Sequence, residues 1–296
     1  MNEDYKNLDL YKYWKESKLH STKDNSFFNT YEELFSKYRK KKITFVEIGV
    51  KWGGSLFMWR DYFGENARII GVDLYPKTKE LEKYGFEIFI GNQSSEQFWK
   101  NFFSEVGSVD IILDDGGHTN ENQILTLNHT LNNVNDNGII VIEDVFSSYD
   151  KKFNNPSKYS FINYSKFLID DLNGRVSDKL QSRLQGTKKK NSLNKKIHSI
   201  QYFTNFVAFF IDRRKCIDTE LFMNREVNQN PSEIITEDFV NPRRFSQIYS
   251  GGFLYTPLIK KIRSKMSFLK KISLINYFYK KLFAHRMNKK LLKFFK

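Results

Sequence analysis

The most constraining feature of this sequence is the alternation of short apolar runs with polar, helix-compatible segments between residues 43 and 142. Apolar runs of this length, ending near glycine or acidic residues, are typical of strands buried on both faces of a sheet. Helices are predicted between them at about 55–63, 96–103 and 121–131, so the chain should form βαβ units with a mainly parallel sheet. The five predicted strands are Ile43–Val50, Arg68–Asp73, Phe86–Ile90, Val109–Leu113 and Gly138–Ile142.

Two later apolar runs, Ile197–Tyr202 and Phe206–Asp212, predict an antiparallel pair of strands that closes the sheet. The expected fold class is therefore α/β, a Rossmann-like, seven-stranded, mostly parallel sheet with helices on both faces. The predicted organisation is a helical lead-in at 1–42, the sheet domain at 43–212 with a polar insertion at 151–196 near the acceptor site, an irregular appendage at 213–257, and a basic amphipathic tail at 258–296.

The net charge of +14 is concentrated in that tail. Residues 258–296 hold 13 of the 48 Lys and Arg residues and no Asp or Glu, so the remaining 35 basic residues nearly balance 34 acidic ones. Nucleic acid is therefore disfavoured as a partner. Apolar residues at helical spacing in the tail suggest peripheral contact with an anionic membrane surface, or packing against the body or a partner such as a second copy.

Targeting signals are missing from the sequence pattern. The N-terminal residues show no basic stretch followed by an apolar run, and no apolar stretch approaches bilayer-spanning length. A single cysteine, Cys216, excludes an internal disulfide. We expect a cytoplasmic protein, with the tail as the one route to the inner face of the membrane.

The first candidate site follows the first predicted strand, where Glu47 and Gly49 precede Gly53 and Ser55. Ligands of open α/β sheets bind beyond the carboxyl ends of the strands, and glycines there let the backbone approach a ligand closely. The helix N-terminus favours a carboxylate, and Glu47 can hold an ammonium group. Asp73 ends the second strand, where it can accept hydrogen bonds from ribose hydroxyls. The alternative is a plain glycine-rich turn with a solvated Asp73.

The glycine pattern also discriminates between cofactors. It lacks the Gly-Lys-Ser/Thr ending of a phosphate loop, and Lys51 stands at the second glycine position of Gly-x-Gly-x-x-Gly. This departure favours S-adenosylmethionine over NAD.

The second candidate site is acidic. Asp114, Asp115 and His118 follow the fourth predicted strand, and Glu143 and Asp144 follow the fifth. If the two strands are neighbours, their ends lie about 5 Å apart, and four carboxylates crowd one small volume. Protons or a cation must neutralise some of them, and Mg²⁺ suits such oxygen ligands. Helix capping, the alternative, explains one or two carboxylates but not four beside a histidine.

Together these motifs resemble the macrocin/mycinamicin-type sugar O-methyltransferases, which have the class I methyltransferase fold and are related to the cephalosporin hydroxylases. The resemblance implies Mg²⁺ ligation by Asp115, Glu143 and Asp144 and a general base at His118. It further implies cofactor contacts, which we expect at Glu47, Gly49, Gly53, Ser55, Asp73, Asn92, Gln93 and Asp114. The matching stretches are Phe45–Leu56, Ile70–Asp73, Ile90–Ser94, Ile112–His118 and Val141–Val145.

The chain also departs from the family pattern. Asn92 and Ser95 stand where the family usually has Asp, and Gly117 stands where it has Ser. A His that often follows the Glu-Asp pair is replaced near Phe146, and residues 21–23 only loosely echo a Thr-Asp-Lys element of the family. These differences bear on the acceptor rather than on the fold.

The expected activity is a methyl transfer, dependent on S-adenosylmethionine and Mg²⁺ or another divalent cation, to a sugar hydroxyl of a glycan or glycosylated metabolite. A bacterial surface polysaccharide is one such acceptor. The reaction needs aligned reactants and a deprotonated oxygen, for which a cation and His118 are suited. Two alternatives stay open: an Fe²⁺-dependent hydroxylase on the same scaffold, and a non-catalytic membrane-surface protein with this fold. A base-modifying nucleic-acid methyltransferase is disfavoured, because Asp114–Gly117 replaces its usual Asn/Asp-Pro-Pro-aromatic motif.

Overall fold

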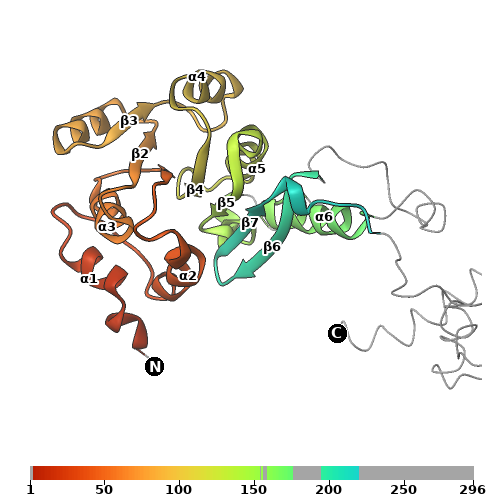
Figure 1. The fold of residues 1–296 in the computed structure, drawn as a ribbon, viewed down its shortest axis with the longest axis horizontal. Helices are drawn as coiled ribbons and strands as arrows, with labels where there is room; N and C mark the ends of the chain where they lie inside the picture. The colour runs from red at the N-terminus through yellow and green to blue at the C-terminus, as the bar shows by residue number, and fades with distance from the viewer. Residues whose placement is uncertain (1–2, 154, 156–158, 176–194, 220–296) are drawn as a thin grey trace, which may run out of the picture. The chain divides into compact units, whose positions relative to one another are not determined.

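The computed structural model describes residues 3–153, 155, 159–175 and 195–219 (Figure 1). These lie in the first of two units, Met1–Leu221 and Phe222–Lys296. The predicted appendage after residue 219 and the predicted basic tail fall outside the described residues. Within the described part, no helix is long and apolar enough to cross a membrane.

Seven strands form one sheet in the order β3-β2-β1-β4-β5-β7-β6 (Figure 1). The pairs among β1 to β5 are parallel, whereas β7 is antiparallel to both β5 and β6. The predicted fold class is confirmed, including the antiparallel closing pair. The strands are β1 (Thr44–Ile48), β2 (Arg68–Asp73), β3 (Glu87–Ile90), β4 (Val109–Asp114), β5 (Val134–Ile142), β6 (Ile197–Phe203) and β7 (Phe206–Ile211).

Helices cover both faces of the sheet. Strand residues alternate between the two faces, so Phe45 packs in one core cluster and Val46 in the other. One cluster contains residues of α1 (Asp9–Lys15), α2 (Phe27–Phe35) and α3 (Gly54–Phe63). The other contains residues of α4 (Glu96–Val106), α5 (Asn120–Thr130) and α6 (Phe161–Asn173). Short 3-10 segments are Asp4–Asn7, Ser36–Tyr38, Pro76–Tyr84, Leu131–Asn133, Val145–Ser148, Lys151–Phe153 and Arg213–Lys215.

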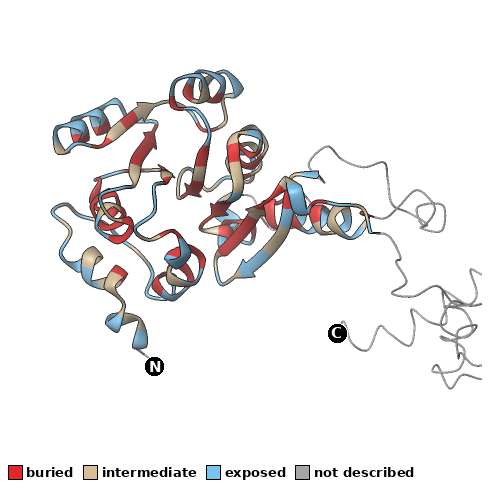
Figure 2. Ribbon diagram, viewed as in Figure 1, coloured by how far each residue is buried: buried red, intermediate tan, exposed pale blue. Residues whose placement is uncertain are grey.

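The central strands are mostly apolar because both of their faces are covered, although β1 contains the buried Glu47 and β4 contains Asp110. Figure 2 shows the buried residues concentrated along these strands, with the exposed residues on the outer faces of the helices and on the edge strand β6. Trp59 and Trp99 are fully buried among core residues, one in each cluster. Burial of this kind is the main favourable contribution to folding.

The strand order brings four strand ends to one place. Ile48, the last residue of β1, lies opposite Val72 of β2 and Asp114 of β4, and Asp114 in turn lies opposite Ile142 of β5. The residues that follow these strands therefore emerge side by side at the carboxyl edge. From β1 the strands follow in one direction to β2 and β3 and in the other direction to β4 and β5, so the strand order reverses between β1 and β4. Open α/β sheets bind ligands at such a reversal.

Candidate active site

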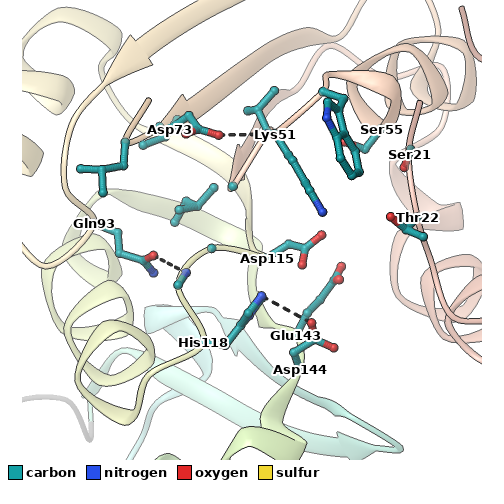
Figure 3. Close-up of a pocket in the computed structure, with 18 of the residues that line it drawn as sticks. Ser21, Thr22, Lys51, Ser55, Asp73, Gln93, Asp115, His118, Glu143 and Asp144 are labelled. Atoms are coloured by element: carbon teal, nitrogen blue, oxygen red, sulfur yellow. Dashed lines mark hydrogen bonds and ion pairs between the residues drawn. The ribbon is translucent and has the colours of Figure 1, made fainter. Parts of the chain in front are cut away.

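A cavity of about 900 Å³ opens at this carboxyl edge (Figure 3). Its walls come from the loops after β1 to β5 and, on the opposite side, from residues 20–24 and Phe27 near the N-terminus. None of the described residues of the 151–196 insertion lines it. The predicted site residues that do line it are Gly49, Ser55, Asp73, Asn92, Gln93, Asp115, His118, Glu143 and Asp144.

Gly49 is required by the close approach of two strand ends. Its φ is +89°, and a Cβ atom at this position would lie 2.1 Å from the backbone oxygen of Asp115. Only glycine adopts this conformation with the loop of β4 so near. Gly53 belongs to the same turn but does not line the cavity. A Cβ atom added at Gly53 would contact the Leu81 side chain.

Gly49→Ala is therefore expected to lower the free energy of unfolding by at least about 3 kcal/mol, because left-handed strain adds to a backbone clash. Gly85→Ala is the matched control, since Gly85 has φ +85° but nothing within 4 Å of the added Cβ. That variant should lose only about 1–2 kcal/mol from the backbone conformation. Urea unfolding of the two variants measures the difference, and equal losses would contradict the close approach.

Asp73 lines the cavity at the end of β2. Its two carboxylate oxygens accept hydrogen bonds from the backbone N–H groups of Lys51 and Tyr75, each at 2.9 Å. A carboxylate oxygen has a second lone-pair direction, so each can accept a further bond from a ligand hydroxyl. The carboxylate is thus fixed in direction and reaches the cavity (Figure 3).

Gln93 and Asp114 form a buried pair next to the cavity. The Gln93 amide donates to both Asp114 oxygens at 3.0 Å, and its own oxygen accepts the Gly117 N–H at 2.8 Å. Asp114 also accepts the Gly116 N–H at 3.1 Å. Gln93 lines the cavity, whereas Asp114 does not. Asp114 instead holds the turn that carries the next acidic residue.

Glu47 is likewise set back from the cavity. It is fully buried and accepts hydrogen bonds from the Ser55 hydroxyl at 2.7 Å and the Trp59 indole at 3.2 Å. Burial raises its pKa to about 7. Ser55 lines the cavity and Glu47 does not. The Glu47 carboxylate is thus bonded to a residue that lines the cavity without lining it itself, and its contact with a ligand's ammonium group stays a prediction.

Three side chains converge at the tips of β4 and β5. Asp115, His118 and Asp144 each offer one ligand atom, and these atoms all lie within 4.8 Å of one another (Figure 3). The His118 Nε2 lies 3.6 Å from the Asp144 Oδ2. His118 and Asp144 both have left-handed backbone conformations, with φ of 54° and 53°. Strained residues of this kind are common at functional sites.

This donor set fits a hard divalent cation, because two carboxylates supply oxygen ligands beside an imidazole nitrogen. Partial burial raises the pKa of Asp144, as expected for carboxylates gathered in one volume. The sequence prediction that two adjacent strand tips bring acidic side chains together is consistent with these distances.

Glu143 has other partners. It is fully buried, and it accepts hydrogen bonds from the Tyr31 hydroxyl and from the Lys23 ammonium, the latter at 3.1 Å. The same ammonium lies 2.6 Å from Asp115 Oδ2. Burial raises the pKa of Glu143. Burial alone would lower the pKa of Lys23, but the two carboxylates hold it well above its usual value.

Lys23 and Tyr31 come from the region that the sequence identified only as a helical lead-in. The one available signal was the loose echo of a Thr-Asp-Lys element at residues 21–23. Lys23 belongs to a segment that we call the strap (residues 17–24), which lies against the loop after β1. The Ser17 hydroxyl donates to the Gly54 carbonyl at 2.8 Å, and the Gly54 N–H donates to the His20 carbonyl at 3.2 Å. The ring centroids of His20 and Trp52 are 4.6 Å apart.

Comparison with known proteins identifies a family and several relatives that this chain resembles. Residues 46–145 match the methyltransferase domain family. Two sugar methyltransferases of Streptomyces olivaceus are similar over about half of this chain. The 8-demethyl-8-alpha-L-rhamnosyl tetracenomycin-C 2'-O-methyltransferase is 28% identical over 158 residues, which are 50% of this chain and 41% of that protein. The corresponding 3'-O-methyltransferase is 31% identical over 158 residues, 49% and 40%.

Mycinamicin VI 2''-O-methyltransferase of Micromonospora griseorubida is 30% identical over 40% of this chain and 31% of its own length. The matched part thus spans less than half the length of each of these relatives. A crystal structure of a mycinamycin-pathway methyltransferase with Mg, SAH and mycinamycin VI superposes with a TM-score of 0.61 at 22% identity, covering 74% of this chain and 56% of that one. The resemblance to macrocin/mycinamicin-type enzymes is confirmed, and the structural likeness supports the fold.

Proposed function

We propose that this chain, whose residues 46–145 match a methyltransferase domain, transfers a methyl group from S-adenosylmethionine to a sugar hydroxyl with the help of a divalent cation. The acceptor we propose is a glycan or a glycosylated metabolite, and a bacterial surface polysaccharide belongs to that class. One observation carries the proposal. A single cavity contains both a glycine turn beside Asp73 and the convergent group of Asp115, His118 and Asp144.

The donor end of the cavity is formed by the loops after β1, β2 and β3. Gly49 keeps the β1 turn open to a ligand, and the N-terminus of α3 with the Ser55 hydroxyl favours a carboxylate there. The Asp73 carboxylate would accept hydrogen bonds from the ribose hydroxyls, and Asn92 also lines the cavity. S-adenosylmethionine would supply the methyl group, carried on its sulfonium, for transfer to the acceptor oxygen.

The acceptor end is formed by the tips of β4 and β5. Asp115 and Asp144 are the residues that would hold the divalent cation, whereas the buried Glu143 is bonded to Lys23 and Tyr31. Such a cation lowers the pKa of a hydroxyl that it contacts and fixes the direction of that oxygen. Two neighbouring hydroxyl groups of a sugar suit this arrangement, since they offer two oxygens at a fixed spacing.

His118 is the proposed general base. An imidazole nitrogen removes the proton of the acceptor hydroxyl, and the resulting positive charge is stabilised by the Asp144 carboxylate, 3.6 Å from Nε2. Its turn is held by the Gln93–Asp114 pair and by the bond between Gln93 and the Gly117 N–H. The buried supports therefore orient a base that itself reaches the cavity.

The proposal is tested by methyl transfer from radiolabelled S-adenosylmethionine to matched acceptors. Rhamnosylated aglycones, their free aglycones and a rhamnose-containing polysaccharide form the panel, each assayed with Mg²⁺ and with excess chelator. Label in the glycosylated acceptors alone, lost with chelator and restored by Mg²⁺, is expected. An Fe²⁺-dependent hydroxylase would instead consume dioxygen without transferring label. Label in the free aglycones would contradict a sugar acceptor.

Asp73→Asn is expected to weaken S-adenosylmethionine binding by about 10- to 100-fold, because hydrogen bonds to a charged acceptor contribute roughly 1.5–3 kcal/mol. Calorimetric titration of the full chain measures this. Asp110→Asn is the matched control, since Asp110 accepts the Thr44 N–H at 2.8 Å from within β4, four residues before the strand ends at Asp114. The control should bind like wild type, and equal losses in both variants would argue against a donor contact at Asp73.

A further inference from the structure

The strap places a positive charge inside the acidic group where the cation is proposed to bind. The Lys23 side chain is only 2% exposed. Its ammonium lies 2.6 Å from Asp115 Oδ2 and 3.1 Å from Glu143 Oε2. Lysine is rarely buried unless it is paired, and here both partners are carboxylates at strand tips.

Asp115 belongs to two groups at once. It pairs with Lys23 on one side, and with His118 and Asp144 it forms the set of ligand atoms that lie within 4.8 Å. A divalent cation and the Lys23 ammonium that both contact Asp115 would repel each other, and the repulsion is strong because the site is partly buried. Glu143 differs, because it is fully buried and its other partner is the Tyr31 hydroxyl.

We propose that Lys23 is a built-in competitor of the divalent cation, so that cation binding at Asp115 is coupled to the position of the strap. This inference rests on the proposed cation site and adds its regulation. When the cation is absent, the single charge of Lys23 partly offsets the charges of Asp115 and Glu143. Cation binding draws Asp115 away from the ammonium, and Lys23 keeps only Glu143 or leaves with the strap.

The contacts of the strap explain how the coupling reaches the rest of the cavity. Gly54 touches the strap so closely that an added Cβ would lie 2.3 Å from the Leu19 oxygen and 2.5 Å from the His20 oxygen. His20 and the following strap residues form the cavity wall opposite the strand tips. A cation that displaces Lys23 therefore loosens that wall, and a strap held in place weakens cation binding by the same factor.

The test measures Mn²⁺ binding to the full chain. Calorimetry and the decrease in the electron paramagnetic resonance signal of free Mn²⁺ both report this binding. Lys23→Met removes the competing charge and is expected to tighten Mn²⁺ binding by at least about tenfold, within the usual range of such couplings. Lys23→Arg keeps the charge and should bind Mn²⁺ as wild type does. Lys18→Met is the matched control, because Lys18 is an exposed lysine of the same strap.

Gly54→Ala displaces the strap without altering any carboxylate, so it too should tighten Mn²⁺ binding; it decides the question if Lys23→Met does not fold. The competition would be overturned if both Lys23→Met and Gly54→Ala bound Mn²⁺ no more tightly than wild type. The proposed function would still stand in that case, provided that wild type binds Mn²⁺. If neither wild type nor these variants bind Mn²⁺, the cation site fails together with the competition.

Discussion

Asp115→Asn is expected to lower kcat for methyl transfer by at least about 10³-fold. Asp115 is the one carboxylate in contact with both charge systems of the site, the Lys23 ammonium and the set with His118 and Asp144. A cation that activates a hydroxyl contributes several kcal/mol to the rate, and each 1.36 kcal/mol corresponds to about tenfold. Asparagine keeps the shape of the side chain and removes the charge. Single-turnover transfer with saturating donor measures the effect.

Donor binding should survive in this variant, because the hydrogen bonds of Asp73 and Ser55 at the donor end do not involve the Asp115 side chain. Asp61→Asn is the matched control, since Asp61 is an exposed carboxylate on α3. It should retain wild-type kcat. A loss of less than about tenfold in Asp115→Asn, with its Mn²⁺ affinity unchanged, would place the cation elsewhere.

His118→Gln is expected to lower kcat by about 10²- to 10⁴-fold, the usual contribution of a positioned general base. Glutamine can still donate a hydrogen bond toward Asp144 but cannot accept a proton at neutral pH. Affinity for S-adenosylmethionine should change little, because the donor end of the cavity lies at the other loops. The measurement is the pH dependence of single-turnover transfer. The variant should lose the fall in rate at low pH that a general base produces in wild type.

His198→Gln serves as the comparison, since His198 is an exposed residue of β6. Its kcat and pH profile should match those of wild type. If His118→Gln keeps the wild-type pH profile while losing rate, His118 acts by positioning and another group removes the proton.

Much of the fold follows from the sequence for a simple reason. Strands covered on both faces are nearly continuous apolar runs, and they stop where the chain meets the polar carboxyl edge. The predicted Arg68–Asp73 therefore agrees with β2 residue for residue, and the helix predicted at about 55–63 is α3. The same regularity predicts Asp115 and Asp144 at neighbouring strand ends, and β4 does pair with β5.

The direction of each side chain was harder to predict. Asp114 and Asp115 are adjacent, and successive side chains of a strand point to opposite sides. One therefore reaches the cavity while the other turns toward Gln93, but the sequence alone does not tell which. Glu47 is similar, because its partners Ser55 and Trp59 are fixed only once α3 packs against β1.

The strap could not be placed from its sequence. Its residues have no regular apolar spacing, and they meet the site across long sequence separations. Lys23 is 92 residues from Asp115 and 120 from Glu143, and Tyr31 is 112 residues from Glu143. Contacts of this kind are set by the packing of α2 beside the sheet and leave no local pattern. Among 48 basic residues, only the loose echo of a Thr-Asp-Lys element at residues 21–23 distinguishes Lys23.

A crystal structure of the full chain with SAH and Mn²⁺ is the most direct test of the central claim. Anomalous scattering locates Mn²⁺ independently of the refined coordinates. The expected result is one peak in the cavity, on the order of 2 Å from a carboxylate oxygen of Asp115 and of Asp144, with SAH beside Asp73. A peak whose ligands include neither carboxylate, or an empty acidic group beside bound SAH, would contradict cation-assisted methyl transfer at these strand tips.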